Sequence, residues 1–301
     1  MPVPPNDPLI RGLCPQPRHV QFTEGRFPLP TVLSWAGPDE VTDAVTTLAE
    51  RLAPALDVVR VTSHTDTASL IVTVNPALEA EGYRIEIDTQ IRITAGDPNG
   101  ARWAVQTLLQ LLPPWVHGPG PLAREHLHLP KGVIADAPHY SWRGAHLDVS
   151  RHFMPASFIT RFLDVLAMHK LNRLHLHLTD DQGWRLPVPG WPRLTTVGAW
   201  RPGTVRGHQP PPDDNDCDDV AEHDHVPHGG AYTVEQLSAI NKRAGLLGIT
   251  VVPEIDLPGH TESVVAAYPA LGCGIPLDHP RTAFGVSEHH INLTDDSLGF
   301  C

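Results

Sequence analysis

Three groups of polar side chains each end or follow a short apolar run in the second half of the chain. The runs are HLDV, LHLHL and VVPEI. In chain order the groups are Asp148, Ser150, Arg151 and His152; Thr179, Asp180, Asp181, Gln182 and Trp184; and Glu254, Asp256 and His260. Because the carboxyl ends of parallel strands form one functional face, we expect the three groups to converge on a single cleft.

Arginine, several carboxylates and tryptophan together suit the recognition of sugars. A planar guanidinium or a carboxylate makes paired hydrogen bonds with neighbouring hydroxyls, and an indole ring offers a flat apolar platform for a pyranose. Trp184, Trp191 and Trp200 lie in or near the long irregular stretch after the second run. The alternative for each tryptophan is ordinary core packing, and we expect at least one of them to be a core residue.

Each polar candidate also has a purely structural interpretation. Asp148 can cap a turn and pair with Arg151. Asp180 and Asp181 can cap the segment that follows them, and His260 can begin a helix. The joint position of these residues after three successive strands favours a site over a set of unrelated caps.

Two stretches rich in histidine need separate treatment. His175 and His177 alternate with leucines and therefore share one face of a strand; hydrogen-bonded core histidines are favoured here over catalytic ones. Segment 208–228 is rich in acids and histidines, so metal binding is conceivable, but its spacings match no ligand motif. We favour a solvated loop there, and we expect neither a metal nor an organic cofactor in the protein.

The elements that must position these groups alternate between strand and helix. Apolar periodicity predicts a strand within 142–150, a helix over 155–170, a strand over 171–178, a helix over 233–248 and a strand over 249–255. Such alternation is typical of a parallel sheet covered by helices. Residues 182–230 form a long irregular stretch between the second strand and the second helix.

The first 135 residues show a different pattern, that of an α+β domain. Strand-like runs cover 17–22, 69–74, 83–88 and 90–96, and helices are predicted over 39–52 and 97–112. Residues 115–131 are rich in Pro, Gly and His, which indicates a linker. We therefore predict a domain at 1–135 and a second one at 136–301, in line with about 150 residues per domain.

Composition excludes several classes of function. The 301 residues carry 22 Lys and Arg against 34 Asp and Glu, a formal charge of −12. An acidic chain suits neither nucleic acid nor an anionic membrane surface, and no apolar run approaches the length of a membrane span. The four scattered cysteines signal neither a zinc ribbon nor a disulfide framework. The start of the chain lacks a secretory pattern, so we expect the cytoplasm, or secretion if a leader was removed.

Several long motifs resemble those of β-N-acetylhexosaminidases of glycoside hydrolase family 20. They are WRGAHLDVSRHFMP, HKLNRLHLHLTDDQGWRLP, HGGAYT and VVPEIDLPGHTES, and GARWAVQTLLQLLP resembles the helix that closes the family's small N-terminal domain. The resemblance implies a non-catalytic α+β domain followed by a (β/α)8, TIM-type barrel. It also implies removal of terminal N-acetylglucosamine or N-acetylgalactosamine with retention, the 2-acetamido group of the substrate acting as nucleophile.

The resemblance assigns roles to individual residues. Arg151 matches an arginine that binds the hydroxyls of the terminal sugar, and Asp180 matches an aspartate that pairs with the histidine at His260. That pair is expected to support the general acid. The other residues that we expect to line or support the substrate pocket are Asp181, Trp184, Glu254 and Asp256, while Arg143 and Asp148 match framework positions.

The sequence departs from the family pattern at the motif that carries the catalytic acid. The catalytic acid of the family belongs to a Gly-Gly-Asp-Glu motif, and the only Asp-Glu dipeptide here is Asp39–Glu40, at the start of a predicted helix. Residues 141–301 show three barrel strands, whereas a whole barrel takes about 250 residues. We therefore expect an incomplete barrel and an inactive, truncated enzyme. The alternatives are a non-catalytic protein that binds amino sugars or a partner, and a related glycosidase with another substrate.

Overall fold

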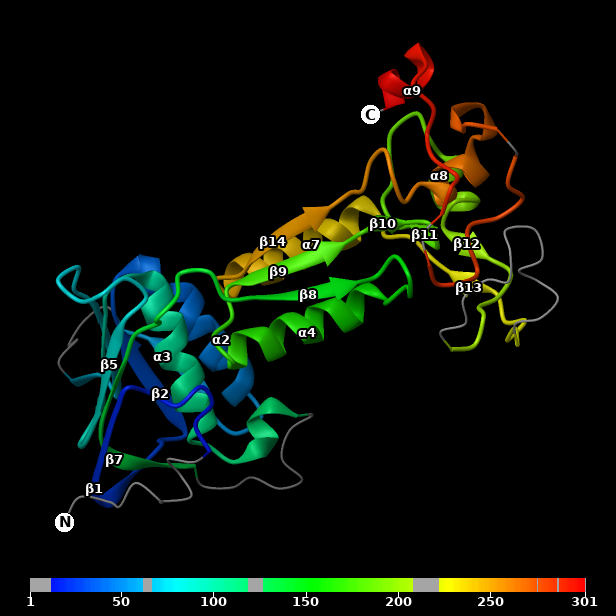
Figure 1. The fold of residues 1–301 in the computed structure, drawn as a ribbon. Coiled ribbons are helices and arrows are strands. Elements are labelled where there is room, and N and C mark those ends of the chain that lie inside the picture. The colour runs from blue at the N-terminus through cyan, green and yellow to red at the C-terminus, as the bar shows by residue number, and fades with distance from the viewer. Residues whose placement is uncertain are drawn as a thin grey trace. The chain divides into compact units, whose positions relative to one another are not determined.

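The computed structural model describes residues 12–61, 67–118, 127–207, 222–274, 276–285 and 287–300. These residues form two compact units (Figure 1). The first unit contains the described residues up to Arg143, together with Leu163–Asn172 and Arg243–Ile249. The second contains Gly144–Phe162, Arg173–Lys242 and the chain from Thr250 onward.

The first unit is built on a seven-stranded mixed sheet in the order β1-β7-β5-β6-β4-β2-β3. Pairs β2/β3, β2/β4 and β4/β6 are parallel, and the pairs of β5 with β6 and of β7 with β5 and β1 are antiparallel. The strands are β1 (His19–Pro28), β2 (Val32–Ala36), β3 (Asp57–Arg60), β4 (Leu70–Val74), β5 (Tyr83–Ile87), β6 (Ile91–Ala95) and β7 (His128–Asp136).

The helices of this unit pack on the apolar face of the sheet. They are η1 (Asp39–Val41), α2 (Thr42–Leu52), α3 (Pro98–Gln110) and η3 (Pro114–His117). Alternate residues of β5 and β6 are buried, and they form one core with α2 and α3. Helix α3 begins as its sequence predicts, since the Asp97 side chain accepts a hydrogen bond from the Gly100 N–H at 2.8 Å and Pro98 occupies the first turn.

The predicted linker over 115–131 is wrong at its C-terminal end, because strand β7 begins at His128. The Pro and Gly residues of HLPKGVIAD suggested a loop, yet β7 pairs with two neighbours. Pro130 lies opposite Arg26, where the register of β1 shifts, and Gly132 has φ +146° with the Gln21 carbonyl too close for a Cβ atom. A β-bulge accommodates both residues, which an unbroken ladder would not. Strands β2 and β3 were not predicted either.

A buried polar cluster ties β5, β7 and α3 to the segment after helix α4. The Lys170 ammonium lies 2.7 Å from the Tyr83 hydroxyl and 3.1 Å from Asp136 Oδ2, and burial lowers the pKa of Lys170 although Asp136 opposes that shift. Beside it, Glu81 Oε2 accepts hydrogen bonds from Trp103 Nε1 at 2.7 Å and from Arg143 at 2.5 Å. Each charge in this cluster has an opposite charge or a donor in contact, as burial requires.

The second unit contains the parallel sheet that the alternating pattern predicts. Its order is β14-β9-β8, and both pairs are parallel. The strands and the helices between them are β8 (Gly144–Asp148), α4 (Ala156–Met168), β9 (Arg173–His177), α7 (Val234–Leu246) and β14 (Thr250–Glu254). All five predicted elements are confirmed, with boundaries within three residues.

Short elements after β9 and β14 surround the carboxyl ends of these strands. They are β10 (Thr179–Asp180), β11 (Gly183–Trp184), α5 (Arg193–Thr196), β12 (Trp200–Arg201), β13 (His228–Gly229), α8 (Glu262–Ala267), η4 (Pro269–Leu271) and α9 (Asp295–Phe300). They enclose a small core of their own. Among the helices of the described residues, none has the length and apolar character needed to cross a membrane.

We predict that Trp103→Phe destabilises the first unit by about 1–3 kcal/mol. The indole is buried, and the substitution removes a hydrogen bond to the partly buried Glu81 carboxylate while filling most of the same volume. Urea unfolding measures the loss. The control is Val59→Ala, at a half-exposed position of β3, which should change the free energy of unfolding by less than about 0.5 kcal/mol. Equal stability of Trp103→Phe and the parent chain would contradict the prediction.

Candidate active site

The three parallel strands bring the three predicted polar groups together. In the sheet register Asp148 lies opposite His177, and His177 lies opposite Glu254, so these residues form one row at the carboxyl end of the sheet. The loops that follow carry Arg151, Asp180 and Asp181, and the segment after β14 carries His260. The predicted convergence on one edge is therefore confirmed by the register and by the contacts described next.

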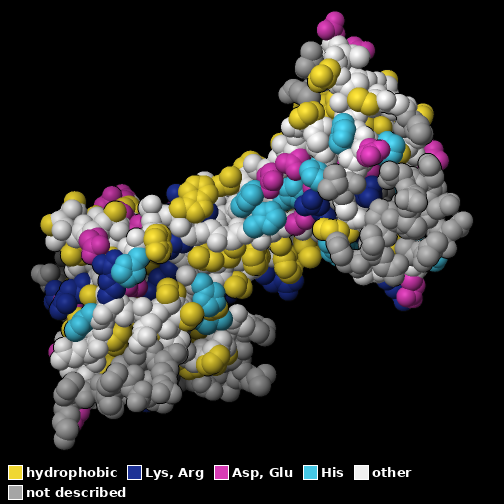
Figure 2. Space-filling view, in the orientation of Figure 1, with side chains coloured by type: hydrophobic (Ala, Val, Ile, Leu, Met, Phe, Trp, Pro, Cys, Tyr) yellow, Lys and Arg dark blue, Asp and Glu magenta, His cyan; other side chains and the backbone are white. Residues whose placement is uncertain are grey.

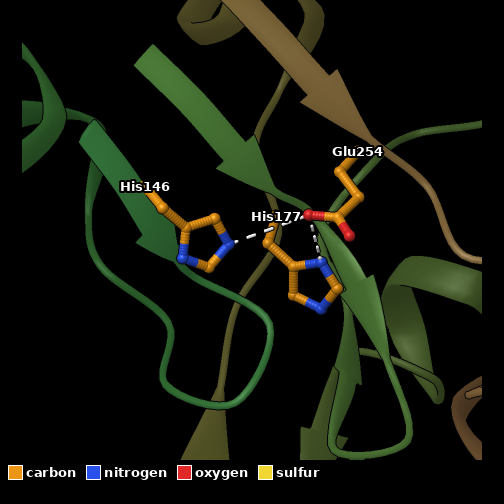
Figure 3. A group of neighbouring side chains, drawn as sticks. All are labelled: His146, His177 and Glu254. Atoms are coloured by element: carbon orange, nitrogen blue, oxygen red, sulfur yellow. Dashed lines mark ion pairs between the residues drawn. The ribbon is translucent and has the colours of Figure 1, made fainter. Parts of the chain in front are cut away.

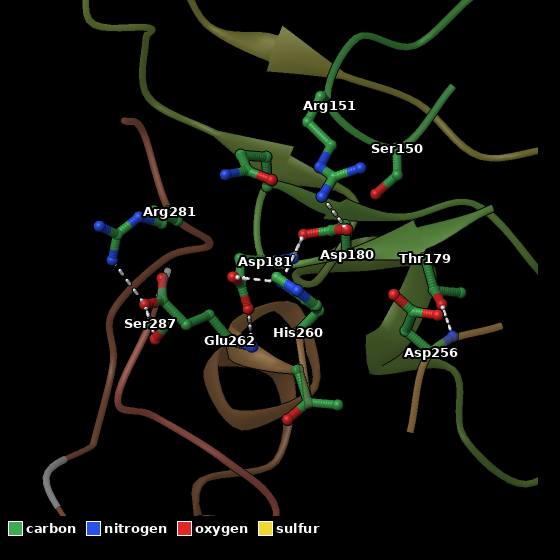
Figure 4. A network of polar contacts seen from close by, with 12 residues as sticks. Ser150, Arg151, Thr179, Asp180, Asp181, Asp256, His260, Glu262, Arg281 and Ser287 are labelled. Atoms are coloured by element: carbon green, nitrogen blue, oxygen red, sulfur yellow. Dashed lines mark hydrogen bonds and ion pairs between the residues drawn. The ribbon is translucent and has the colours of Figure 1, made fainter. Parts of the chain in front are cut away.

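Arg151 is held between two carboxylates. Its Nη1 lies 2.9 Å from Asp148 Oδ2. Its Nη2 lies 2.5 Å from Asp180 Oδ2 (Figure 4). Asp148 Oδ1 also accepts the backbone N–H groups of Ser150 and Arg151, so Asp148 caps a turn as well as forming an ion pair. The Arg151 side chain keeps 38% of its surface exposed, so the guanidinium is fixed in orientation and still reaches solvent.

Asp180 is a fully enclosed charge of the site, with no exposed surface. Its Oδ2 contacts both Arg151 and His177 Nε2, the latter at 2.8 Å. Its Oδ1 accepts the Asp181 N–H at 2.7 Å and lies 3.3 Å from His260 Nδ1. A buried carboxylate is costly unless hydrogen bonds and positive charge compensate it, and here both oxygens have such partners.

The expected contact of His260 with Asp180 is present as an ion pair, and His260 also hydrogen-bonds the neighbouring acid, Asp181. His260 Nδ1 lies 3.1 Å from Asp181 Oδ2 and slightly farther from Asp180. The backbone of His260 has φ 52°, in the left-handed region that few residues other than glycine adopt. This strained conformation belongs to the turn that carries the imidazole beside both acids.

Asp181 supports the loop after β14, and it is not placed to contact a sugar as expected. The side chain is fully buried, and Oδ1 accepts the Glu262 N–H at 3.2 Å at the start of α8. Glu262 is itself buried and binds Arg281 Nη1 at 3.0 Å and the Ser287 hydroxyl. Glu262, Arg281 and Ser287 were not identified from the sequence. Glu262 could have been noticed as the acid in the HTES segment that follows the third strand.

The expected sugar platform at Trp184 is also corrected. Only 3% of Trp184 is exposed, its Nε1 donates to the Leu186 carbonyl at 2.8 Å, and its ring packs against Phe300. It is therefore a core residue, the alternative that the sequence left open. Trp191 packs edge-on against Tyr268, whereas Trp200 is half-exposed.

Glu254 and Asp256 both lie near the His177 ring, and each also has contacts of its own. Glu254 Oε2 lies 2.6 Å from His175 Nε2 and 2.9 Å from His177 Nδ1. Burial acts to raise the pKa of Glu254, but contacts with His177 and His175 outweigh it and hold that pKa below its ordinary value. The Asp256 N–H donates to Thr179 Oγ1 at 3.0 Å, and its carboxylate lies near His177 and Asp180.

A fully buried arginine, Arg185, organises the loops around the site and was not among the predicted residues. It donates to the backbone carbonyls of Val149, Ser150, Ala199 and Gly230, at 2.5–3.0 Å. Burial, followed by the charge of Arg201, lowers the pKa of Arg185 to about 10, so the side chain remains a cation at neutral pH. Its four acceptors come from three separate loops, which one guanidinium therefore joins.

Two stacked histidines lie near the same arginines. The rings of His152 and His228 are 4.1 Å apart, and His228 Nε2 accepts the Phe153 N–H at 2.9 Å. Burial and the positive charges of Arg201, His152 and Arg185 lower the pKa of His228 to about 4, with a small opposing effect of Asp224. Burial and the same two arginines lower the pKa of His152. With a pKa of about 4, the His228 ring is neutral near pH 7.

Fold and site together define a class of protein: a small α+β domain joined to a parallel β/α sheet, with an arginine between carboxylates at the carboxyl edge. Comparison with family models agrees. Residues 140–300 match the catalytic domain of glycosyl hydrolase family 20, and residues 11–137 match domain 2 of the same family. The chain belongs to glycosyl hydrolase family 20.

Individual relatives agree with this assignment. A β-hexosaminidase of Akkermansia muciniphila is 39% identical over 215 residues, covering 71% of this chain and 39% of the relative. A β-hexosaminidase of Vibrio furnissii is 33% identical over 274 residues, covering 89% of this chain and 41% of the relative. The chain thus spans about two fifths of the length of these relatives.

Solved structures of the family superimpose well on the chain. A family 20 β-N-acetylhexosaminidase of Streptomyces coelicolor aligns with a TM-score of 0.79 at 31% identity, covering all of this chain and 56% of that one. A family 20 exo-β-N-acetylglucosaminidase of Vibrio harveyi, solved with N-acetylglucosamine, aligns with a TM-score of 0.77 at 28% identity, covering 97% and 43%.

We predict that Arg185→Leu costs at least about 3 kcal/mol of stability, because it leaves four backbone carbonyls without their donor. Chemical denaturation monitored by fluorescence measures the loss. Arg206→Ala is the matched control, since Arg206 is exposed and its ion pair with Glu222 is at the surface. A cost below about 1 kcal/mol for Arg185→Leu would show that water replaces the guanidinium at these carbonyls.

We predict that acid destabilises the second unit between about pH 6.5 and pH 4. The pKa of His228 is lower in the folded chain than its ordinary 6.5, so the unfolded chain binds the proton first as the pH falls. Stability from this group is therefore complete above pH 6.5 and is lost progressively down to about pH 4. Denaturation midpoints measured over this range should fall less steeply for His228→Gln, whose amide oxygen can still accept the Phe153 N–H. His19→Gln, at an exposed position of β1, should keep the parent slope, and an unchanged slope in His228→Gln would refute the assignment.

Proposed function

We propose that the chain provides the sugar-recognition part of an exo-acting β-N-acetylhexosaminidase. Its substrates would be oligosaccharides or glycoconjugates that end in N-acetylglucosamine or N-acetylgalactosamine. Family membership and the names of the relatives support this reaction class. The observation that carries the proposal is the geometry of Arg151, fixed between Asp148 and Asp180 and still partly exposed.

The fixed guanidinium suits two neighbouring hydroxyls of a terminal sugar. Asp148 and Asp180 each take one side of the fork, so the side chain loses little further conformational freedom when a ligand binds. Arginine keeps unused N–H donors after two such contacts, because it has five in one plane. The neighbouring carboxylate Asp148 is itself partly exposed and can accept from a hydroxyl. Arg151 is thus proposed as a substrate-binding residue.

The histidine beside the two acids is proposed as a positioning residue for proton transfer. Asp180 and Asp181 fix the Nδ1 side of the His260 ring, and 38% of the His260 side chain is exposed on the open side of the loop. Carboxylates in this arrangement select the tautomer that carries a proton on Nδ1 and leave Nε2 free to accept a hydrogen bond from an acid. In a family mechanism that acid is the glutamate of the Gly-Gly-Asp-Glu motif.

The sequence contains no Gly-Gly-Asp-Glu motif, which favours sugar binding over turnover by these 301 residues alone. The Asp39–Glu40 dipeptide begins η1 in the first unit and takes no part in the site. We propose that residues 1–135 are a non-catalytic domain and that residues 136–301 contribute strands and loops to a catalytic barrel. Binding of an amino sugar without hydrolysis is the second candidate function.

We predict that the 301-residue chain binds N-acetylglucosamine and that Arg151→Ala weakens this binding at least about tenfold. The loss corresponds to one or two charge-assisted hydrogen bonds. Titration calorimetry or ligand-observed NMR measures the affinity. Arg151→Lys tests the planar fork, because it keeps the charge and should still lose most of the affinity. Arg206→Ala serves as the control and should bind like the parent chain.

Hydrolysis of nitrophenyl N-acetyl-β-glucosaminide shows whether these 301 residues also turn over a substrate. Binding without measurable turnover supports a recognition role for these residues and places the acid outside the printed sequence. Turnover by the 301-residue chain that is lost in Arg151→Ala would support the enzyme and require an acid among the residues present. No binding by the parent chain, with both units folded, would overturn the proposal.

A further inference from the structure

A row of histidines faces one carboxylate on the sheet of the second unit. His146 comes from β8, His177 from β9 and Glu254 from β14 (Figure 3). Their ligand atoms all lie within 4.8 Å of one another. His175, two residues before His177, lies on the same face and contacts Glu254 at 2.6 Å. Figure 2 shows histidine and acidic side chains gathered on the face over these strands.

We propose that His146, His177 and Glu254 bind one divalent transition-metal ion of the zinc type. Two imidazoles and a carboxylate form a donor set that zinc and its neighbours prefer, and three protein ligands leave positions for water or a further ligand. His175 then hydrogen-bonds Glu254 at the edge of the site. The ion would cross-link three parallel strands through their side chains, in addition to the backbone hydrogen bonds that already join the strands.

The state of the His177 ring carries the proposal. Nε2 of this ring makes its hydrogen bond with Asp180 Oδ2, at 2.8 Å. Nδ1 is buried, 2.9 Å from Glu254 Oε2, and has no hydrogen-bond partner among the described residues. If Nε2–H donates to Asp180 and Nδ1 is unprotonated, the lone pair of Nδ1 points at a carboxylate. Two acceptors at this distance repel each other unless a proton or a metal ion lies between them, and the metal ion is the occupant that we propose.

The contact with Asp180 is also the arrangement that orients metal-ligating histidines. Such a histidine usually donates its second ring N–H to a carboxylate, which fixes the tautomer and raises the basicity of the ligating nitrogen. Asp180 is fully buried and provides that carboxylate from the loop directly after β9. The His177 ring therefore has a ligating atom on one side and its orienting acid on the other.

The two other clusters of acids and histidines at this edge are poorer candidates for a metal. Both contain Asp180, and one also contains Asp181 and His260. Arg151 lies 2.5 Å from Asp180 and already neutralises it, so a second cation there would meet the guanidinium. The contacts of Glu254 are instead with three imidazoles, which are neutral ligands when they bind a metal.

The first test is zinc binding to tag-free chain, by calorimetry and by metal analysis after dialysis against Zn²⁺. The parent chain is expected to bind one ion that His146→Leu loses or binds at least about tenfold more weakly. Half of the His146 side chain is exposed, so this variant should fold. His19→Leu, at an exposed position of the first unit, removes one histidine elsewhere and should bind like the parent chain. Circular dichroism checks that both variants are folded.

Two further measurements keep the proposal falsifiable. With Co²⁺ in place of zinc, the parent chain should give visible d–d absorption that changes in His146→Leu and in Asp180→Asn, which removes the orienting carboxylate. A variant with His208, His223 and His225 replaced by Ala tests the acid- and histidine-rich stretch. Metal binding that disappears in this variant and survives in His146→Leu would overturn the proposal, as would a parent chain that binds no Zn²⁺. None of these measurements depends on the proposed hydrolase activity.

Discussion

The buried carboxylate of Asp180 is the constraint on which the rest of the site depends. A charge without exposed surface must be compensated by its neighbours, and Asp180 receives Arg151, His177, the Asp181 N–H and, at slightly longer range, His260. These partners come from the loop after β8, from β9 itself and from the segment after β14. One buried charge therefore links three loops, and it fixes Arg151, whose side chain is partly exposed.

A buried cation complements that anion a few residues farther along the chain. Arg185 has no carboxylate partner among its hydrogen bonds; it is stabilised by four carbonyl dipoles and by the Phe153 ring at 5.6 Å. The loop backbone around the site would otherwise bury those carbonyls without donors, because irregular segments lack a ladder to satisfy them. Arg185 thus supplies the hydrogen-bond donors that a helix or a sheet would otherwise provide to these carbonyls.

Sequence reasoning succeeded where a short-range pattern and the fold agree. The apolar runs that became β8, β9 and β14 have strand composition, and the helices between them have a clear 3.6-residue period, so the parallel sheet and its polar edge followed. It failed where a tertiary contact overrides local signals. Strand β7 contains Pro130 and Gly132 and is recognisable only with its bulged partner β1, and β2 and β3 were also missed.

In the site, too, the sequence was enough to predict several of the residues that lie together. It was not enough to predict which of them contact one another. The acids, Arg151 and His260 were identifiable because polar residues after apolar strands are conspicuous. Which of two adjacent aspartates accepts from His260 depends on the turn that holds His260 at φ 52°, and no local pattern reveals that. Trp184 and Arg185 are adjacent in the sequence, and both are buried. Trp184 packs against Phe300 and Arg185 donates to the Gly230 carbonyl, and neither partner is close in the sequence.

The proposed sugar and metal sites share the His177 ring, and this has a physical consequence. Burial lowers the pKa of His177, but Asp180, Asp148 and Glu254 together raise it above its ordinary value, so the pocket favours a positive charge on this ring. A cation at Nδ1, whether a proton or a metal ion, strengthens Nε2–H as a donor to Asp180. Arg151 contacts the same oxygen of Asp180. The charge between His177 and Glu254 is therefore coupled electrostatically to Arg151 through the Asp180 carboxylate.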